Sequence, residues 1–178
     1  DLKISLLRGN VGTRLAKLEA GECDATFLAA AGLNRLGQTD VITHLVETCD
    51  MLPAPAQGAV GVQIRSDDEK VLSYVAPLDD PATDICITAE RALLKSLDGS
   101  CRTPIAALAQ LDGTHLRLRA QALTPDGQIS FERDTVIALG DAPKIDAYAL
   151  GYSLGSDIRL EAGEAIQWDM PEMSVGQT

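Results

Sequence analysis

Two arginines flank a glycine-containing turn near the start of the sequence, in the segment RGNVGTR (Arg8–Arg14). A strand that runs into such a turn and opens a helix presents backbone N–H groups to an anion, and the helix dipole adds to the attraction. Each guanidinium can hold a carboxylate through two parallel hydrogen bonds. The same spacing also suits a structural turn with two solvated arginines, so the spacing alone leaves both interpretations open.

The sequence of this turn restricts which anion it could bind. A phosphate-binding P-loop has Lys and Ser or Thr directly after its last glycine, and a dinucleotide fingerprint has a third glycine. The segment RGNVGTR has neither feature. If it binds an anion, the pattern therefore favours carboxylates over nucleotides.

A cysteine between turn residues is the second candidate. Cys101 follows the expected end of a helix in the segment LDGSCRTPI, and Arg102 beside it favours the thiolate. Such a thiol could act as a nucleophile or as the attachment point of a covalent group. A nucleophilic cysteine needs an activating base, and we expect the two histidines, His44 and His115, at the surface or at caps. Attachment is therefore the preferred interpretation.

The remaining cysteines, Cys23, Cys49 and Cys86, lack CxxC spacing and are expected to be inert core residues. We predict neither a disulfide framework nor a metal site. Free thiols indicate a reducing, cytoplasmic compartment. A third candidate site is the segment AQGA (residues 56–59), where a Gln between small residues could approach a ligand, although a close-packed strand crossing accounts for it equally well.

The elements that would position these residues alternate between strands and helices in the first half of the chain. Apolar runs predict strands at 3–7 and 57–65, and a buried strand or strand-to-loop segment at 24–31. Helices are expected after Asn10 as an N-cap and before Gly21, over 32–36, over 67–76, and from Pro81 or Ala82 to Leu97. This alternation predicts an α/β unit with parallel strands.

The second half has a different pattern. Alternating residues over Leu116–Leu123 and Ile129–Leu139, separated by the turn sequence TPDG, predict a β-hairpin with one apolar face. A helix over Ala142–Leu160 would cover that face. The sequence therefore predicts a small α+β domain with an antiparallel sheet after the α/β unit. The tail from about Glu161 has little periodicity, and we expect part of it to be disordered.

Composition excludes several classes of protein. The chain has 178 residues, a formal net charge of −11 and only 3% aromatic residues, which disfavours nucleic acid as a partner. No stretch approaches the roughly 20 apolar residues of a membrane-spanning helix. Because Asp1 is not an initiator and the first residues already read as a strand, we expect that the chain was cut from a longer one.

Four segments, in order, resemble the porphobilinogen deaminase (hydroxymethylbilane synthase) family: RGNVGTRLAKL, DATFLAAAGLNRLG, LPAPAQGAVGV and ERALLKSLDGSCRTPI. The resemblance covers residues 2–160. It implies a transferase of tetrapyrrole and heme biosynthesis that condenses four porphobilinogens head to tail with release of ammonia. It also implies a covalent dipyrromethane cofactor, held by a thioether to the cysteine at position 101.

The resemblance implies a division into three parts. Residues 1–50 match part of the family's second domain, a periplasmic-binding-protein-like α/β fold. Residues 51–76 match a returning strand and connector of the first domain, and residues 77–178 match the third, cofactor-carrying α+β domain. The remainder of the first domain, with its catalytic Asp in a Lys-Asp-x-Pro setting, has no counterpart here, so no catalytic residue is assigned and the chain alone is expected to be inactive.

The resemblance also implies which residues line the cofactor and substrate cleft: Arg8, Asn10, Thr13, Arg14, Leu28, Ala29, Arg35, Gln57 and Gly58. Ala56 departs from the family's usual Gly before the Gln. The implied partners are porphobilinogen, the growing polypyrrole chain and the missing N-terminal domain, in a protein that is a monomer when complete. An alternative is a non-catalytic carboxylate-binding module that retains the fold.

Overall fold

A computed structural model describes residues 2–97 and 103–166 of the chain. Its contacts divide the chain into two compact units, Asp1–Glu47 and Thr48–Thr178. Each unit is described by itself below.

The first unit contains two short helices, α1 (Val11–Glu19) and α2 (Ala30–Arg35), and the single 3-10 turn η1 (Thr39–Val41). Asn10 caps α1, because its Oδ1 accepts a hydrogen bond from the Thr13 N–H at 2.9 Å. The chain leaves α1 through Gly21 and α2 through Gly37, both at positive φ. The predicted N-cap and both predicted helices are therefore confirmed.

The strands predicted at 3–7 and 57–65, and the strand alternative at 24–31, are wrong for this structure, since none of those residues pairs with a strand among the described residues. A strand must satisfy its backbone groups on a neighbouring strand, and the described chain offers none beside these segments. Many of their apolar side chains lie in solvent, with Ile4 93% and Val60 92% exposed. The described part of the first unit thus contains no parallel sheet.

The second unit is built from three α-helices, an antiparallel sheet and two short 3-10 turns. In chain order these are α3 (Glu69–Val75), η2 (Ala76–Leu78), α4 (Pro81–Ser96), β1 (Ile105–Asp112), β2 (His115–Leu123), β3 (Ser130–Ala138), α5 (Pro143–Ala162) and η3 (Gly163–Ala165). Asp80 caps α4 by accepting from the Thr83 N–H at 2.7 Å, with Pro81 in the first turn. These helices lie where the sequence predicts them.

The sheet is a meander in the order β1-β2-β3. The hairpin of β2 and β3 pairs Leu123 with Ser130 across the turn that contains Gly127, as predicted. Strand β1, which the sequence analysis did not predict, pairs with β2 through a turn at Gly113. The predicted small α+β domain is therefore present, with one more strand than expected.

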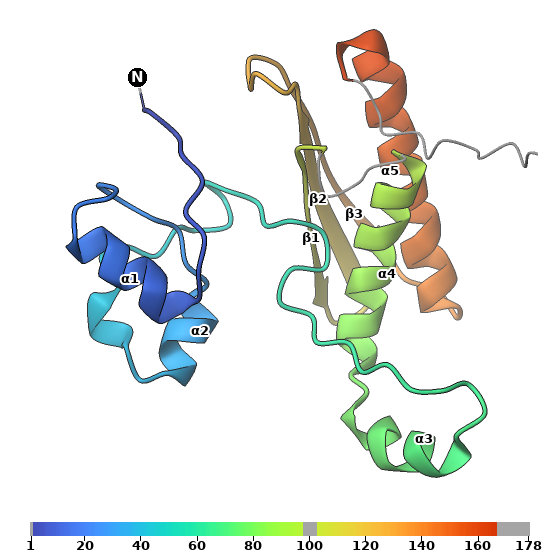
Figure 1. Cartoon of the computed structure of the whole chain (residues 1–178). Coiled ribbons are helices and arrows are strands. Elements are labelled where there is room, and N and C mark those ends of the chain that lie inside the picture. Colours follow the sequence, from blue (N-terminus) through green and yellow to red (C-terminus); the bar gives the residue numbers. More distant parts are fainter. Residues whose placement is uncertain (1, 98–102, 167–178) are drawn as a thin grey trace, which may run out of the picture. The chain divides into compact units, whose positions relative to one another are not determined.

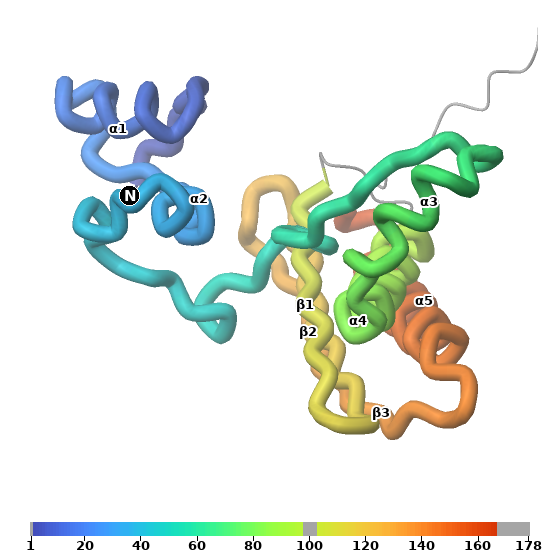
Figure 2. The backbone as a smooth tube through the Cα atoms, turned by 90° about the horizontal axis from the view of Figure 1, so that it is seen from below, coloured from blue at the N-terminus to red at the C-terminus, as the bar shows by residue number. Residues whose placement is uncertain are grey.

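Helices α4 and α5 cover the same face of the sheet (Figures 1 and 2). The alternate residues Leu116, Leu118, Ala120 and Ala122 of β2 are buried against them. The residues between these, including Arg117 and Arg119, lie on the opposite, polar face. One continuous apolar core therefore lies between the sheet and the helix pair.

The two helices approach so closely that two glycines of α5 leave no room for a side chain. A Cβ added at Gly151 would lie 2.8 Å from the carbonyl carbon of Ala89 and closer still to its oxygen. A Cβ at Gly155 would lie 2.7 Å from the Leu93 carbonyl oxygen and would overlap the Ser96 hydroxyl. Backbone of α4 therefore packs directly on backbone of α5.

We expect Gly151→Ala to destabilise the second unit. Overpacking against the fixed backbone of α4 costs about 3 kcal/mol, and the better helix propensity of Ala returns about 1 kcal/mol. The net loss in the free energy of unfolding, measured by urea denaturation, is thus about 2 kcal/mol. The control is Ser153→Ala at an exposed position of α5, and an unchanged midpoint for Gly151→Ala would contradict the packing described.

Candidate functional site

The turn before α1 gathers three of the predicted binding residues. The Asn10 Oδ1 accepts from both the N–H and the hydroxyl of Thr13 at 2.9 Å, and the Arg14 Nε donates to the Gly9 carbonyl oxygen at 2.9 Å. Gly9 has φ +133°, and a Cβ there would lie 2.8 Å from the Thr13 side chain. The turn therefore requires glycine and fixes the Arg14 side chain along it.

The Arg14 guanidinium keeps donors for a ligand. Its Nε is bonded to the turn, and within the described residues no protein partner is present for its two terminal nitrogens. Arg8 is exposed just before the turn. A cation beside a helix N-terminus is suited to carboxylates, as the sequence predicts.

The other predicted residues of the first unit lie at opposite ends of α2. Ala29 is the N-cap, and its carbonyl accepts from Gly32 and Leu33 at 3.0 and 3.3 Å, with half-buried Leu28 before it. Arg35 is exposed in the last turn. Helical rise separates the two ends by about 9 Å, so Ala29 and Arg35 do not form one local cluster.

Gln57 and Gly58 lie in a tight turn of the second unit instead of the predicted strand. Gln57 N–H donates to the Ala54 carbonyl at 3.0 Å, and Ala59 N–H donates to Ala56 at 3.2 Å. Both predicted binding residues are exposed. Ala56 has φ +60°, the one positive φ of a non-glycine residue in the described chain. This explains why a glycine suits that position.

A buried carboxylate that the sequence analysis missed holds this turn. Glu90, in the middle of α4, is only 5% exposed and accepts from the backbone N–H of Ala56 at 2.6 Å and of Ala109 at 2.7 Å. Burial raises the pKa of the Glu90 carboxyl, and the two backbone hydrogen bonds oppose that rise. In the sequence Glu90 stands between Ala89 and Arg91 in an amphipathic helix, and this setting is typical of a surface charge.

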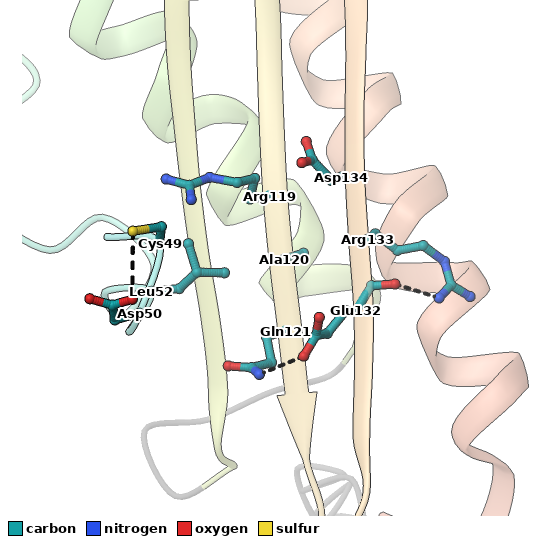
Figure 3. Close-up of a pocket in the computed structure, with 9 residues that line it drawn as sticks. All are labelled: Cys49, Asp50, Leu52, Arg119, Ala120, Gln121, Glu132, Arg133 and Asp134. Atoms are coloured by element: carbon teal, nitrogen blue, oxygen red, sulfur yellow. Dashed lines mark hydrogen bonds between the residues drawn. The ribbon is translucent and has the colours of Figure 1, made fainter. Parts of the chain in front are cut away.

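A second polar cluster lies on the open face of the sheet (Figure 3). A cavity of about 350 Å³ is bordered by Cys49, Asp50, Leu52, Arg119, Ala120, Gln121, Glu132, Arg133 and Asp134. Arg119 reaches from β2 to Thr48, donating to its carbonyl at 3.1 Å and to its hydroxyl at 3.0 Å. Arg117 forms a bidentate pair with Asp134, and its hydrogen bonds lower the pKa of that carboxyl. The polar side chains around this cavity thus largely satisfy one another's hydrogen-bonding groups.

The cysteines separate into different environments. The expectation that Cys49 belongs to the core is wrong. Cys49 is exposed and borders the cavity on the polar face of the sheet. Cys23 and Cys86 are half-buried, and Cys86 packs against the core. Cys101 lies outside the described residues. Both histidines, His44 and His115, are exposed as expected.

Comparison with known proteins identifies both parts of the chain. Residues 1–73 match the family model described as "Porphobilinogen deaminase, dipyromethane cofactor binding domain", and residues 84–159 match "Porphobilinogen deaminase, C-terminal domain". The chain belongs to the porphobilinogen deaminase family. All nine predicted binding residues lie within the first match, while Glu90 and Cys101 lie within the second.

Curated relatives named porphobilinogen deaminase support this membership. The protein of Nitrobacter hamburgensis is 44% identical over 164 residues, and that of Nitrobacter winogradskyi is 43% identical over 164 residues. The protein of Paracoccus denitrificans is 48% identical over 162 residues. These alignments cover 91–92% of this chain but 50% of each relative, so the chain spans about half the length of these porphobilinogen deaminases.

Within the described residues, no group of three or more His, Cys, Asp or Glu side chains is placed to hold a metal ion. The helices that the structure describes also include none with the length and apolar character needed to cross a membrane.

We expect Ala56→Gly to stabilise the second unit. A left-handed conformation costs an L-residue about 1–2 kcal/mol, and the greater freedom of glycine in the unfolded chain offsets about 0.5–1 kcal/mol of the relief. The free energy of unfolding should rise by about 0.5–1 kcal/mol. Ala54→Gly, in the same segment at ordinary φ, is the control and should lower it. A loss of stability in Ala56→Gly would show that Ala56 does not adopt this conformation.

Proposed function

We propose that this chain is the cofactor-carrying half of a hydroxymethylbilane synthase, which condenses four porphobilinogens head to tail and releases ammonia. The observation that carries the proposal is the match of residues 1–73 to a dipyromethane cofactor binding domain, because this region contains the arginine-flanked turn. Each pyrrole unit bears an acetate and a propionate, so the growing chain is a polyanion. Arg8 and Arg14 beside a helix N-terminus suit such a ligand.

The donor set also fits a bound dipyrromethane. Arg14 offers its terminal nitrogens, while the Asn10–Thr13 cap holds the helix start in place. Gln57, with Gly58 after it, provides an exposed amide. When bound through a thioether to Cys101, the dipyrromethane supplies the primer that the condensation extends. Leu28, Ala29 and Arg35 are proposed to contribute to the same cleft.

The partner of the first unit is proposed to be the N-terminal half of the same enzyme. The relatives are about twice as long as this chain. Leu2, Ile4, Leu6 and Phe27 are 72–93% exposed here, and burying such side chains on neighbouring strands would complete the periplasmic-binding-protein-like domain. The free state of the three described cysteines suits a reducing cytoplasm.

Arg14→Lys should weaken substrate binding without changing stability. Lysine keeps the charge and loses the planar fork that binds a carboxylate through two hydrogen bonds. In the longer protein we expect the KM for porphobilinogen to rise about tenfold, with the melting temperature nearly unchanged. Arg91→Lys, exposed on α4, is the matched control. A fall in melting temperature at constant KM would assign Arg14 a structural role.

The isolated chain should not form hydroxymethylbilane. It lacks the Lys-Asp-x-Pro motif, and positioned proton transfer contributes about 10²–10⁴-fold to such reactions. Incubation with porphobilinogen, followed by acid cyclisation and oxidation, should yield no uroporphyrin. Turnover comparable to a full-length relative would place the catalytic acid within this chain.

The longer protein, produced with its N-terminal half, should carry two linked pyrroles on the Cys101 peptide when mapped by mass spectrometry. Finding them on Cys23, Cys49 or Cys86 would overturn the attachment site. An active protein without any pyrrole adduct would overturn the proposed role of the chain, and an unmodified, inactive protein that binds carboxylates would favour a binding module instead.

A further inference from the structure

Groups from outside the sheet form hydrogen bonds with the free edge of β1. Successive residues of an antiparallel strand direct their N–H groups to alternate sides, so Ala107, Ala109 and Leu111 share the edge away from β2. Ala107 N–H donates to the Pro53 carbonyl at 2.9 Å, and Ala109 N–H donates to Glu90 at 2.7 Å. Two backbone N–H groups of this otherwise open edge are thus satisfied by groups from outside the sheet.

Glu90 bridges two segments that are distant in sequence, the turn at Ala56 and strand β1. Its Oε1 takes the Ala109 N–H of β1, and its Oε2 takes the Ala56 N–H of the turn. Together with the Pro53–Ala107 bond, this attaches residues 53–56 to β1 and α4 at both ends of the segment. Residue 90 is 34 positions from Ala56 and 19 from Ala109, so the bridge is a tertiary contact and not a local turn.

Only an ionised carboxylate suits both bonds. It is an acceptor at both oxygens, whereas a glutamine amide has one accepting oxygen and an NH₂ group that would face the second N–H. The bond to Ala56 also acts on the residue held at φ +60°. A strained backbone conformation persists where its surroundings hold it firmly, and the carboxylate provides that restraint.

We propose that Glu90 is a positioning residue, which locks the Pro53–Ala56 segment onto the α+β unit and thereby presents Gln57 at a fixed point. The lock itself rests on the contacts above. Its effect on ligand binding rests on the proposed function, in which Gln57 contacts the cofactor or substrate. Glu90 touches neither group itself, since both of its oxygens are occupied by backbone donors.

The lock is tested on this chain by amide hydrogen exchange. In Glu90→Gln the amides of Ala56 and Gln57 should exchange at least about tenfold faster than in the unmodified chain, because the charged acceptor is lost. The amide of Leu118 in the central strand β2 should change far less. Glu164→Gln, which removes the same charge from an exposed position, is the matched control and should leave all these rates unchanged.

A second measurement needs no variant. In the unmodified chain, NMR coupling through the hydrogen bond should connect the Ala56 nitrogen with the Glu90 carboxyl carbon. If Glu90→Gln does not fold, this coupling still shows whether the Ala56 N–H donates to the Glu90 carboxylate. Absence of the coupling, or an Ala56 amide that exchanges equally fast in the folded Glu90→Gln variant, would overturn the lock.

The functional consequence is tested in the longer protein with a double-mutant cycle. Glu90→Gln should raise the KM for porphobilinogen severalfold with a smaller effect on kcat, and it should add little to the KM of Gln57→Ala, because both changes remove the same contact. Additive effects on KM would overturn the action of Glu90 through Gln57. An unmodified longer protein without activity would instead overturn the proposed function, while the exchange result on this chain would still stand.

Discussion

The direct packing of α4 backbone on α5 backbone is the constraint on which the second unit depends. Gly151 and Gly155 remove the side chains that would hold the helices apart, and α4, packed in this way, also reaches the edge of the sheet. From that position α4 delivers Glu90 to the Ala109 amide in its middle. Its C-terminal end leads into the segment that contains Cys101. The geometry of one helix pair therefore supports the turn that contains Gln57.

The same arrangement explains why residues 53–56 belong with the C-terminal unit, although the family model that covers them begins at residue 1. Their hydrogen bonds go to β1 and α4. A short connector thus gains fixed backbone positions without forming a strand of its own. The predicted division into residues 1–50, 51–76 and 77–178 stays a prediction, because it refers to domains that include the N-terminal half.

Local signals allowed much of the fold to be predicted from the sequence. Asn10, Asp80 and Pro81 mark helix starts through backbone chemistry that needs no distant partner. The hairpin of β2 and β3 follows from alternation and a turn sequence. Strand β1 was missed because its alanines carry little of the β-branched or aromatic character typical of strands, although its alternation and the Asp-Gly turn after it were available signals.

The predictions that failed share a different cause. In each case the environment of the residue is set by a part of the chain that is distant in sequence. The strands predicted in the first unit lack a neighbouring strand among the residues that the structure describes. The charge of Glu90 looks like a surface feature until the edge of β1 is placed beside it, and Cys49 is exposed because of where the sheet lies. Of the candidate site, the Asn10 cap and the Arg14 turn were predictable from spacing, but the support of Gln57 was not.

The bridge through Glu90 also imposes an order on the folding of the chain as it is synthesised. A ribosome releases Pro53 and Ala56 well before α4, and it releases Ala109 later still, at about 5–20 residues per second. During that interval the segment has no acceptor for the Ala56 amide, and Ala56 is free to relax to negative φ. Only when β1 has emerged and docked can the carboxylate receive both amides. The left-handed turn at Ala56 is therefore a late product of assembly, imposed on the nascent chain by residues made after it.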